Sequence, residues 1–288
     1  MKTYLLLLFS VIIWGWTFVA TKICLSFMSP IELVGLRFLI GVPLLLGIIR
    51  FNRIPFEFTA TEFRAVAIGS IIIAVHFLLQ AVAMTYTTAT NTSWIIATSP
   101  LALAVLSFLI LKERVGSNQI AGIAAASLGV ILLVSGGNFR SLGWLNSIGD
   151  WMILASANTW ALYTIVTRDV SRSRNPLVVT LCVFTPVTAL CLGYLLLFDD
   201  LHHLSSLPAE PVIALLFLGI LGTVTQWFWQ IGIARLGAAR AGTFLYLEPV
   251  ATTVLAVPLL KEPFTLYAAA GGLMVTAGVW WAQAGSKS

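Results

Sequence analysis

The chain has 288 residues, of which 59% are hydrophobic and only 9% are charged, with a mean hydropathy of +0.98 and a formal net charge of +5. A soluble domain carries about 25% charged residues to cover its surface, so this composition excludes an ordinary soluble protein and predicts a surface that faces lipid. The three cysteines are too few and too scattered for a disulfide framework or a metal site.

Ten apolar stretches of membrane-spanning length follow one another along the chain. A helix needs roughly 20 residues to cross the hydrocarbon core, and each stretch comes close to that length. None shows the alternation of a strand, so we expect helices. The predicted fold is an all-α polytopic membrane protein with ten transmembrane helices, at about residues 4–22, 31–49, 65–85, 92–111, 117–135, 151–167, 176–198, 210–230, 242–260 and 266–284.

The chain contains an internal repeat. Pro100 is followed twelve residues later by Lys112-Glu113, and Pro249 is followed twelve residues later by Lys261-Glu262. At this offset of 149, 11 of the 31 residues in 100–130 are identical to their partners in 249–279. Such identity across a gap-free stretch indicates that the chain consists of two related halves.

An earlier pair fixes the boundary between the halves. Trp14 with Lys22 returns as Trp160 with Arg168, at an offset of 146. We therefore predict two five-helix repeats, residues 1–145 and 146–288. Because five is odd, the second repeat enters the membrane from the opposite side, and inverted repeats of this kind are typical of secondary transporters.

Basic residues sort by membrane side when the loops are numbered alternately from an inside N-terminus. Cytoplasmic loops carry the excess of Lys and Arg in membrane proteins. The inside segments hold twelve, namely Lys2, Arg50, Arg53, Arg64, Lys112, Arg114, Arg168, Arg172, Arg174, Arg235, Arg240 and Lys287, and the outside segments hold Lys22, Arg140 and Lys261. We expect a multi-pass protein of the cell (inner) membrane with both termini in the cytoplasm.

Several motifs resemble one known family. The run Trp14-Gly15-Trp16-Thr17-Phe18-Val19-Ala20-Thr21-Lys22 resembles the first-helix signature of the EamA family, in the drug/metabolite transporter superfamily. Arg37-Phe38, the two proline-to-glutamate phrases and Trp160-Ala161-Leu162-Tyr163 are similar to later motifs of that family, in the same order. The resemblance implies export of amino acids and related metabolites, through a cavity lined by helices 1, 3, 4, 6, 8 and 9.

Polar and aromatic side chains at helical spacing mark the faces that would line such a cavity. Deep tryptophans suit either cavity lining or plain packing. The side-chain amides of Gln80 and Gln230 would bind a carboxylate or an amine, or else join helices by hydrogen bonds. The donors expected for a substrate carboxylate are Gln80, Gln230, Asn91 and His76. The predicted substrate-binding residues are Trp14, Thr17, His76, Gln80, Asn91, Trp94, Trp160, Tyr163, Trp227, Gln230, Phe244 and Glu248.

Glu248 is the most informative of these residues. A carboxylate inside a membrane helix is costly unless it is neutral, paired or hydrated, so such a residue is a functional candidate by default. Its partner in the repeat is Ser99, so the scaffold itself does not demand an acid. The alternative is a structural role, in which Glu248 supports a helix disturbed by Pro249 or pairs with Arg235 or Arg240.

Other residues also have two interpretations. His76 could carry a coupling proton or stay neutral and hydrogen-bonded. Arg37 is interpreted as structural, either snorkelling outward or pairing with Glu32. Small residues on the fifth and tenth helices could join the two halves or two subunits, and these residues are Gly122, Ala126, Gly129, Gly271, Gly278 and Ala282.

Together these features predict a secondary transporter of amino acids or similar small amphipathic metabolites that works by alternating access. Its partners would be a small-molecule substrate and the lipid bilayer, with proton coupling as an option, and the direction of export rests on the resemblance alone. No enzyme activity, cofactor, metal or nucleic-acid partner is expected, and the oligomeric state stays open. The alternatives are multidrug or aromatic-cation efflux and, behind it, a non-transporting scaffold or channel.

Overall fold

The structure is a computed structural model that describes residues 1–112, 116–135, 147–198, 201–260 and 266–284. All regular secondary structure in these ranges is helical, which confirms the all-α prediction for them. The elements are α1 (Lys2–Leu25), α2 (Pro30–Phe51), α3 (Ala60–Tyr86), α4 (Ala89–Ile96), α5 (Ser99–Leu109), α6 (Ser117–Ser135), α7 (Ile148–Ser173), α8 (Pro176–Phe198), η1 (Leu201–Ser206), α9 (Ala209–Leu236), α10 (Ala238–Gly242), η2 (Thr243–Leu247), α11 (Glu248–Leu260) and α12 (Leu266–Ala284).

Six spans in the described part of the chain are long and apolar enough to cross a membrane. They are α1, α2, α3, the combined segment Ala89–Leu109, α8 and α9. Their length matches the roughly 30 Å of hydrocarbon that a transmembrane helix must cover. The chain is therefore built as a multi-pass membrane protein.

Three of the helices begin at capping boxes. The side chain of Ser29 accepts a hydrogen bond from the Glu32 backbone N–H, and the Glu32 carboxylate accepts one from the Ser29 N–H. Thr59 with Glu62 starts α3 in the same way, and Ser147 starts α7 together with Asp150. Each box satisfies N–H groups that a helix start leaves without partners, so these short polar motifs set where the spans begin.

The prediction of one continuous helix is wrong for two of the ten stretches. The stretch predicted at 92–111 is α4 followed by α5, with a break at 97–98. The stretch predicted at 242–260 begins as η2 and becomes α11 at Glu248. Pro100 and Pro249 are the second residues of α5 and α11. The first N–H groups of a helix have no partner inside it, so the missing N–H of a proline costs no hydrogen bond at this position. The breaks fall at equivalent places, because Ser99 and Glu248 are 149 residues apart.

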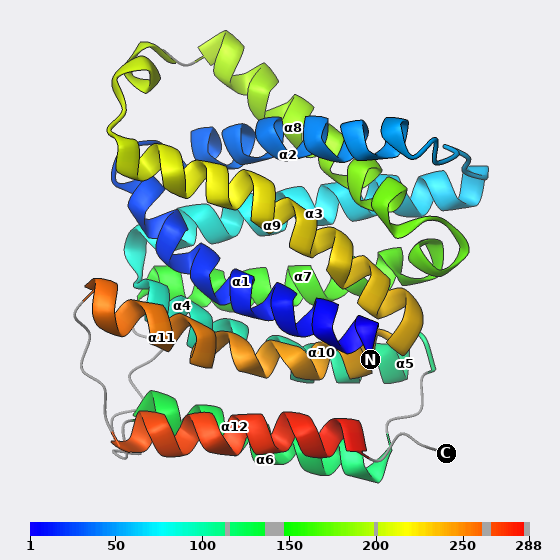
Figure 1. Ribbon diagram of the computed structural model, residues 1–288, viewed down its shortest axis with the longest axis vertical. Helices are drawn as coiled ribbons and strands as arrows, with labels where there is room; N and C mark the ends of the chain where they lie inside the picture. Colours follow the sequence, from blue (N-terminus) through cyan, green and yellow to red (C-terminus); the bar gives the residue numbers. More distant parts are fainter. Residues whose placement is uncertain (113–115, 136–146, 199–200, 261–265, 285–288) are drawn as a thin grey trace.

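Helices α6 and α12 lie side by side and antiparallel along one edge of the molecule (Figure 1). A Cβ on Gly122 would lie 2.5 Å from the carbonyl oxygen of Gly278, and a Cβ on Gly129 would lie 2.8 Å from that of Gly271. The backbones therefore meet at small residues, as in other close membrane-helix pairs. Of the two interpretations of these residues, the structure shows the contact between the first and second halves of the chain.

A second contact between the halves runs along α3 and α7. His76 on α3 contacts Ser156 on α7, and Gly69 lies against Thr167 and Tyr163. Glu62, at the first turn of α3, reaches Arg174 just past the end of α7. These positions run in opposite directions along the two helices, so α3 and α7 are antiparallel.

In Figure 1, α1 begins and α12 ends toward the same end of the helices. Glu113, Lys261 and Glu262, which carry half of the repeated phrases, lie outside the described residues, as do Arg114, Arg140 and Lys287.

Candidate functional site

A pocket that is partly open to solvent lies where the two halves meet; its empty volume, with the open solvent at its mouth included, is about 520 Å³. It is lined from α1, α2, α3, α4, α5, α7, α9, η2 and α11. In the numbering of the ten predicted helices, these are the six expected to line a cavity, together with the second. The lining residues are Trp14, Thr17, Phe18, Arg37, His76, Phe77, Gln80, Ile96, Ser99, Trp160, Gly222, Gln226, Leu245 and Glu248.

Three tryptophans pack together beside the cavity. The rings of Trp14 and Trp160 meet edge to face with centroids 5.6 Å apart, and both contact Trp229, at 5.3 and 4.8 Å. Aromatic pairs at these separations stabilise one another beyond the area they bury. Trp14 and Trp160 occupy equivalent positions in the repeat, so the halves contribute matching rings to one aromatic cluster. Trp229 was not among the predicted residues.

Glu248 opens α11 and is 2% exposed. Its place is set by a close crossing of α1, because a Cβ on Gly15 would lie 2.8 Å from the carbonyl oxygen of Glu248. Thr252 fastens the same crossing by donating to the carbonyl oxygens of Gly15 and Glu248. Within the described residues, the carboxylate of Glu248 makes no hydrogen bond or ion pair, so the pairing with Arg235 or Arg240 does not occur there. The acid therefore faces the cavity without a partner.

Arg37 also lines the cavity, although the sequence indicated a structural residue on α2. It is 8% exposed, and its guanidinium lies over two rings, 4.8 Å from the centroid of Phe77 and 5.1 Å from that of Phe38. It approaches α9 at Gly222, where a Cβ would lie 2.9 Å from Nη2. In the described chain it has no hydrogen bond or ion pair, and its Nε–H is buried without an acceptor. The predicted pairing with Glu32 is thus not present.

Two further polar atoms at the cavity lack partners. The hydroxyl of Ser99 and the Nε2 amide of Gln226 are buried and make no hydrogen bond within the described residues. Buried polar groups are hydrogen-bonded in the great majority of cases, so these two side chains are available to a molecule that enters the cavity. Ser99 stands at the start of α5 as Glu248 stands at the start of α11, and therefore the two helix breaks deliver one polar side chain each.

His76 lines the cavity but is held by α7. Its Nδ1 lies 2.9 Å from both the carbonyl oxygen and the hydroxyl of Ser156. A carbonyl oxygen can only accept, so the contact places the ring hydrogen on Nδ1 and leaves Nε2 as an acceptor in the neutral ring. This is the hydrogen-bonded arrangement that the sequence offered as the alternative to proton transfer.

Tyr163 and Gln230 lie outside the lining and form a buried chain of hydrogen bonds. Ser171 donates to Oε1 of Gln230 at 2.8 Å, and Nε2 of Gln230 donates to the hydroxyl of Tyr163. Gln226, one turn before Gln230 on α9, lines the cavity, and its Nε2 amide makes no hydrogen bond within the described residues.

The remaining predicted residues lie away from the cavity lining. Asn91 donates to Oδ1 of Asp150 at 2.6 Å and so ties the start of α4 to the start of α7. Trp94 has a buried indole N–H without a described partner. Trp227 packs on Phe228 with centroids 5.3 Å apart, and Phe244 lies 6.0 Å from the ring of Tyr4. Of the twelve predicted residues, Trp14, Thr17, His76, Gln80, Trp160 and Glu248 do line the cavity.

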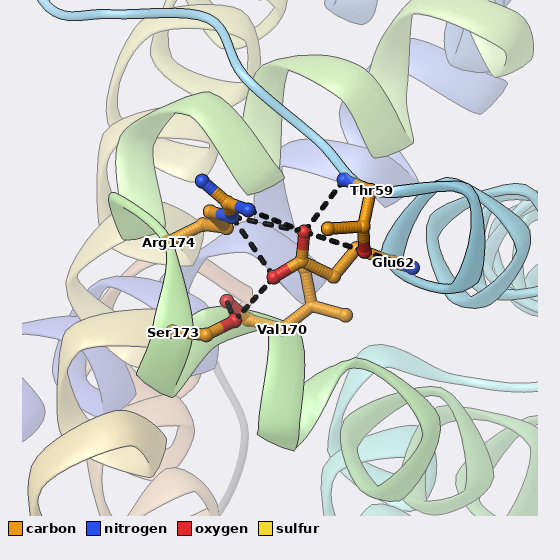
Figure 2. Close-up of polar contacts among 5 residues, drawn as sticks. All are labelled: Thr59, Glu62, Val170, Ser173 and Arg174. Atoms are coloured by element: carbon orange, nitrogen blue, oxygen red, sulfur yellow. Dashed lines mark hydrogen bonds and ion pairs between the residues drawn. The ribbon is translucent and has the colours of Figure 1, made fainter.

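A charged clamp joins the halves at the end of the molecule where α3 begins (Figure 2). The Glu62 carboxylate accepts hydrogen bonds from Nε of Arg174 at 2.8 and 2.9 Å, and Nη2 of Arg174 lies 2.8 Å from Oε2. Ser173 and Thr59 donate to the same carboxylate at 2.9 Å. Forked arginine–carboxylate contacts are strong and directional. The clamp closes the seam between α3 and α7 at this end.

Taken together, the site offers an unpaired acid, an unpaired guanidinium and apolar aromatic walls. No group of three or more His, Cys, Asp or Glu side chains able to hold a metal occurs in the described ranges. Such an arrangement is suited to binding a small molecule that carries opposite charges on an apolar body.

The chain is similar to known transporters along most of its length. The chain matches the model of the EamA-like transporter family at residues 1–135 and again at 147–282. It is 27% identical over 281 residues to an "Uncharacterized transporter" of Archaeoglobus fulgidus, covering 97% of this chain and 96% of that protein. It is 27% identical to a "Probable amino-acid metabolite efflux pump" of Salmonella typhimurium, covering 97% and 94%. A protein of the same printed name from Escherichia coli is 25% identical, with 97% and 94% covered.

A solved crystal structure supports the fold. It superposes with a TM-score of 0.79 over 99% of both chains at 19% sequence identity. At that identity the likeness concerns the arrangement of the helices alone.

Proposed function

Because the chain belongs to the EamA-like transporter family, we propose that it is a secondary transporter for amino acids or similar small amphipathic metabolites in the cell membrane. The names of the family and of its relatives indicate transport rather than catalysis. The observation that carries the proposal for the substrate is the buried, unpaired carboxylate of Glu248 in a cavity walled by aromatic rings. It would bind the ammonium group of the substrate.

The chemistry of the walls favours small zwitterions over other solutes. Sugars need many polar contacts, whereas the lining here is mostly apolar, with Phe18, Phe77, Ile96 and Leu245 among its residues. Phosphates would demand several basic groups, and Arg37 is the single basic side chain of the described lining, apart from the imidazole of His76. An amino acid with an apolar side chain has one group of each charge, and it therefore matches the one acid, the one guanidinium and the apolar walls of the described lining.

The proposed topology has ten spans in two inverted repeats, residues 1–145 and 146–288, with both termini in the cytoplasm. Four observations support it. The family model matches once in each half. The helix breaks at Ser99 and Glu248 fall at equivalent positions, and the repeat-related helices α6 and α12 pack on each other through Gly122 and Gly278. The basic residues of the sequence favour one side of the membrane by twelve to three.

Transport would proceed by rocking of the halves around the fixed cavity. The Glu62–Arg174 clamp would hold the seam shut on the cytoplasmic side in one state and part in the other. The sequence carries no phosphate-binding loop, so the driving force would be an ion gradient, exchange or the gradient of the substrate itself. Export is the direction that the printed names of the efflux relatives favour.

One observation favours a second candidate, efflux of aromatic cations. The clustered rings of Trp14, Trp160 and Trp229 stand beside an acid, and aromatic faces attract cations. Unlike an amino acid, an aromatic cation has no carboxylate, so this alternative requires no group in the cavity that binds one. The two candidates can therefore be separated by the charge of the molecules that compete.

The test is exchange by purified protein in liposomes. Labelled phenylalanine and leucine are offered against a panel of amino acids, nucleosides, sugars and aromatic cations. We expect saturable exchange of at least one of the two amino acids, inhibited by other amino acids, and cells that overproduce the protein should tolerate toxic amino-acid analogues better. If aromatic cations exchange and compete while no amino acid does, the amino-acid proposal is wrong and multidrug efflux replaces it.

A further inference from the structure

Resting on the proposed function, we propose that Arg37 and Gln226 form a subsite that binds the carboxylate of the substrate, opposite in charge to Glu248. The cavity would then recognise both charged groups of an amino acid, the ammonium group at Glu248 and the carboxylate at Arg37 and Gln226. The sequence assigned the carboxylate to Gln80, Gln230, Asn91 and His76. Of these, Gln230 and Asn91 are engaged elsewhere, and His76 already uses its ring N–H on Ser156.

Arg37 has the properties of a carboxylate-binding side chain. The guanidinium keeps its charge at any physiological pH and presents a planar fork of donors that fits a carboxylate. It is 92% buried, lies on the rings of Phe77 and Phe38, and meets no acid within the described residues. The rings orient the group but accept none of its strong hydrogen bonds. An anion that enters the cavity would supply the acceptors.

Gln226 stands beside this guanidinium. Gly222, which Arg37 Nη2 approaches, is one helical turn before Gln226 on α9 and lines the same cavity. Glycine matters here because any side chain at 222 would meet the guanidinium. The two donors therefore converge on one part of the wall, where a carboxylate can accept from both.

Gln226 lies beside a buried hydrogen-bonded group. Nε2 of Gln230, one turn further along α9, donates to the Tyr163 hydroxyl, and Oε1 of Gln230 accepts from Ser171. Nε2 of Gln226 is buried at the cavity and makes no hydrogen bond within the described residues. It is therefore available to a carboxylate that enters the cavity.

The experiment measures competition by four molecules that share one aromatic body. Against labelled phenylalanine exchange in liposomes, we compare unlabelled phenylalanine, phenylalaninamide, phenethylamine and 3-phenylpropanoate. With the wild type, phenylalanine should compete about 10- to 100-fold better than the amide and the amine, which lack the carboxylate, since hydrogen bonds to a charged group are worth that much. The acid without an amine should be equally poor.

The variants assign this preference to residues. In Arg37→Gln the advantage of phenylalanine over its amide should fall below about threefold, and in Arg37→Lys it should be intermediate, because the charge stays and the fork is lost. Gln226→Leu should reduce the same ratio by removing the second donor. The matched control is Arg50→Gln, on the exposed end of the same helix, which should keep the wild-type ratio.

Each outcome decides one claim. A wild-type protein that exchanges amino acids but accepts the amide as well as the acid overturns the carboxylate subsite and leaves the proposed function standing. The same conclusion follows if Arg37→Gln exchanges phenylalanine with an unchanged ratio. Where that variant cannot be purified as a folded protein, Gln226→Leu decides in its place. A protein that exchanges phenethylamine and no amino acid overturns the proposed function itself.

Discussion

Replacing one glycine should show what holds the two halves together at the edge of the molecule. In Gly122→Ala, the new Cβ would lie 2.5 Å from the carbonyl oxygen of Gly278 and 2.5 Å from the backbone nitrogen of Ala282. Both are backbone atoms, which cannot rotate away. Because van der Waals contact requires roughly 3.5 Å, α6 and α12 must separate by about 1 Å to admit one methyl group.

The size of the effect follows from that collision and from a control. Overpacking of a close contact costs about 1–3 kcal/mol in unfolding free energy. Gly47, on α2, has no atom within 4 Å of an added Cβ. Gly47→Ala should therefore be neutral or more stable by about 0.5–1 kcal/mol, because alanine loses less backbone freedom than glycine in a helix. The two variants should differ by about 1.5–4 kcal/mol.

The assay is reversible unfolding of the purified protein in mixed micelles titrated with SDS. We expect Gly278→Ala to resemble Gly122→Ala. The double variant should cost less than the sum of the single ones, since both relieve the same contact by separating the same helices. If Gly122→Ala is as stable as Gly47→Ala, the small residues are not what joins α6 to α12, and this description of the interface is wrong.

Three further outcomes are expected. Glu248→Gln should lower amino-acid exchange at least about tenfold and flatten its pH dependence while the protein stays monodisperse; unchanged kinetics and an unchanged pH profile would leave only a structural role. Glu62→Gln and Arg174→Gln should each speed the labelling of a cysteine in the cavity by a thiol reagent added on the clamp side, and the double variant should add little, whereas equal labelling in all forms would show that the clamp is no gate. In a cysteine-free background, cysteines at Asn52 and Ala209 should label from the cytoplasm and from outside, respectively, and labelling from one common side would contradict the inverted repeat.

The sequence was sufficient for the all-helical class of the described residues and for six of the residues that line the cavity. Apolar length predicts a span whatever its neighbours are, and polar residues on an apolar helix must face something other than lipid, as Gln80 and Glu248 do. The breaks at 97–98 and 243–247 could not be read in the same way, because each lies within a stretch that is long and apolar enough to be read as one continuous helix. Pro100 and Pro249 were the available signal, since proline favours the first turn of a helix over its interior.

The sequence also does not show at which level along its helix a polar residue meets the cavity. Gln226 and Gln230 are one turn apart on the same face of α9, and nothing in their spacing tells which level meets the cavity. The position of Arg37 at the cavity could not be predicted for a related reason. Its helix has no polar stripe, and the room for its guanidinium is made by Gly222, 185 residues further along the chain. Such a fit between distant residues is visible only once α2 and α9 are packed.

The pairing of α6 with α12 also dictates an order of events during synthesis. The chain leaves the ribosome from its N-terminus, so α6 enters the bilayer long before its partner exists, with Gly122 and Gly129 turned toward lipid or a temporary neighbour. In the described part of the chain, α12 (Leu266–Ala284) covers these two glycines. A chain that stops short of residue 266 therefore presents an open small-residue surface of the kind that binds other membrane helices.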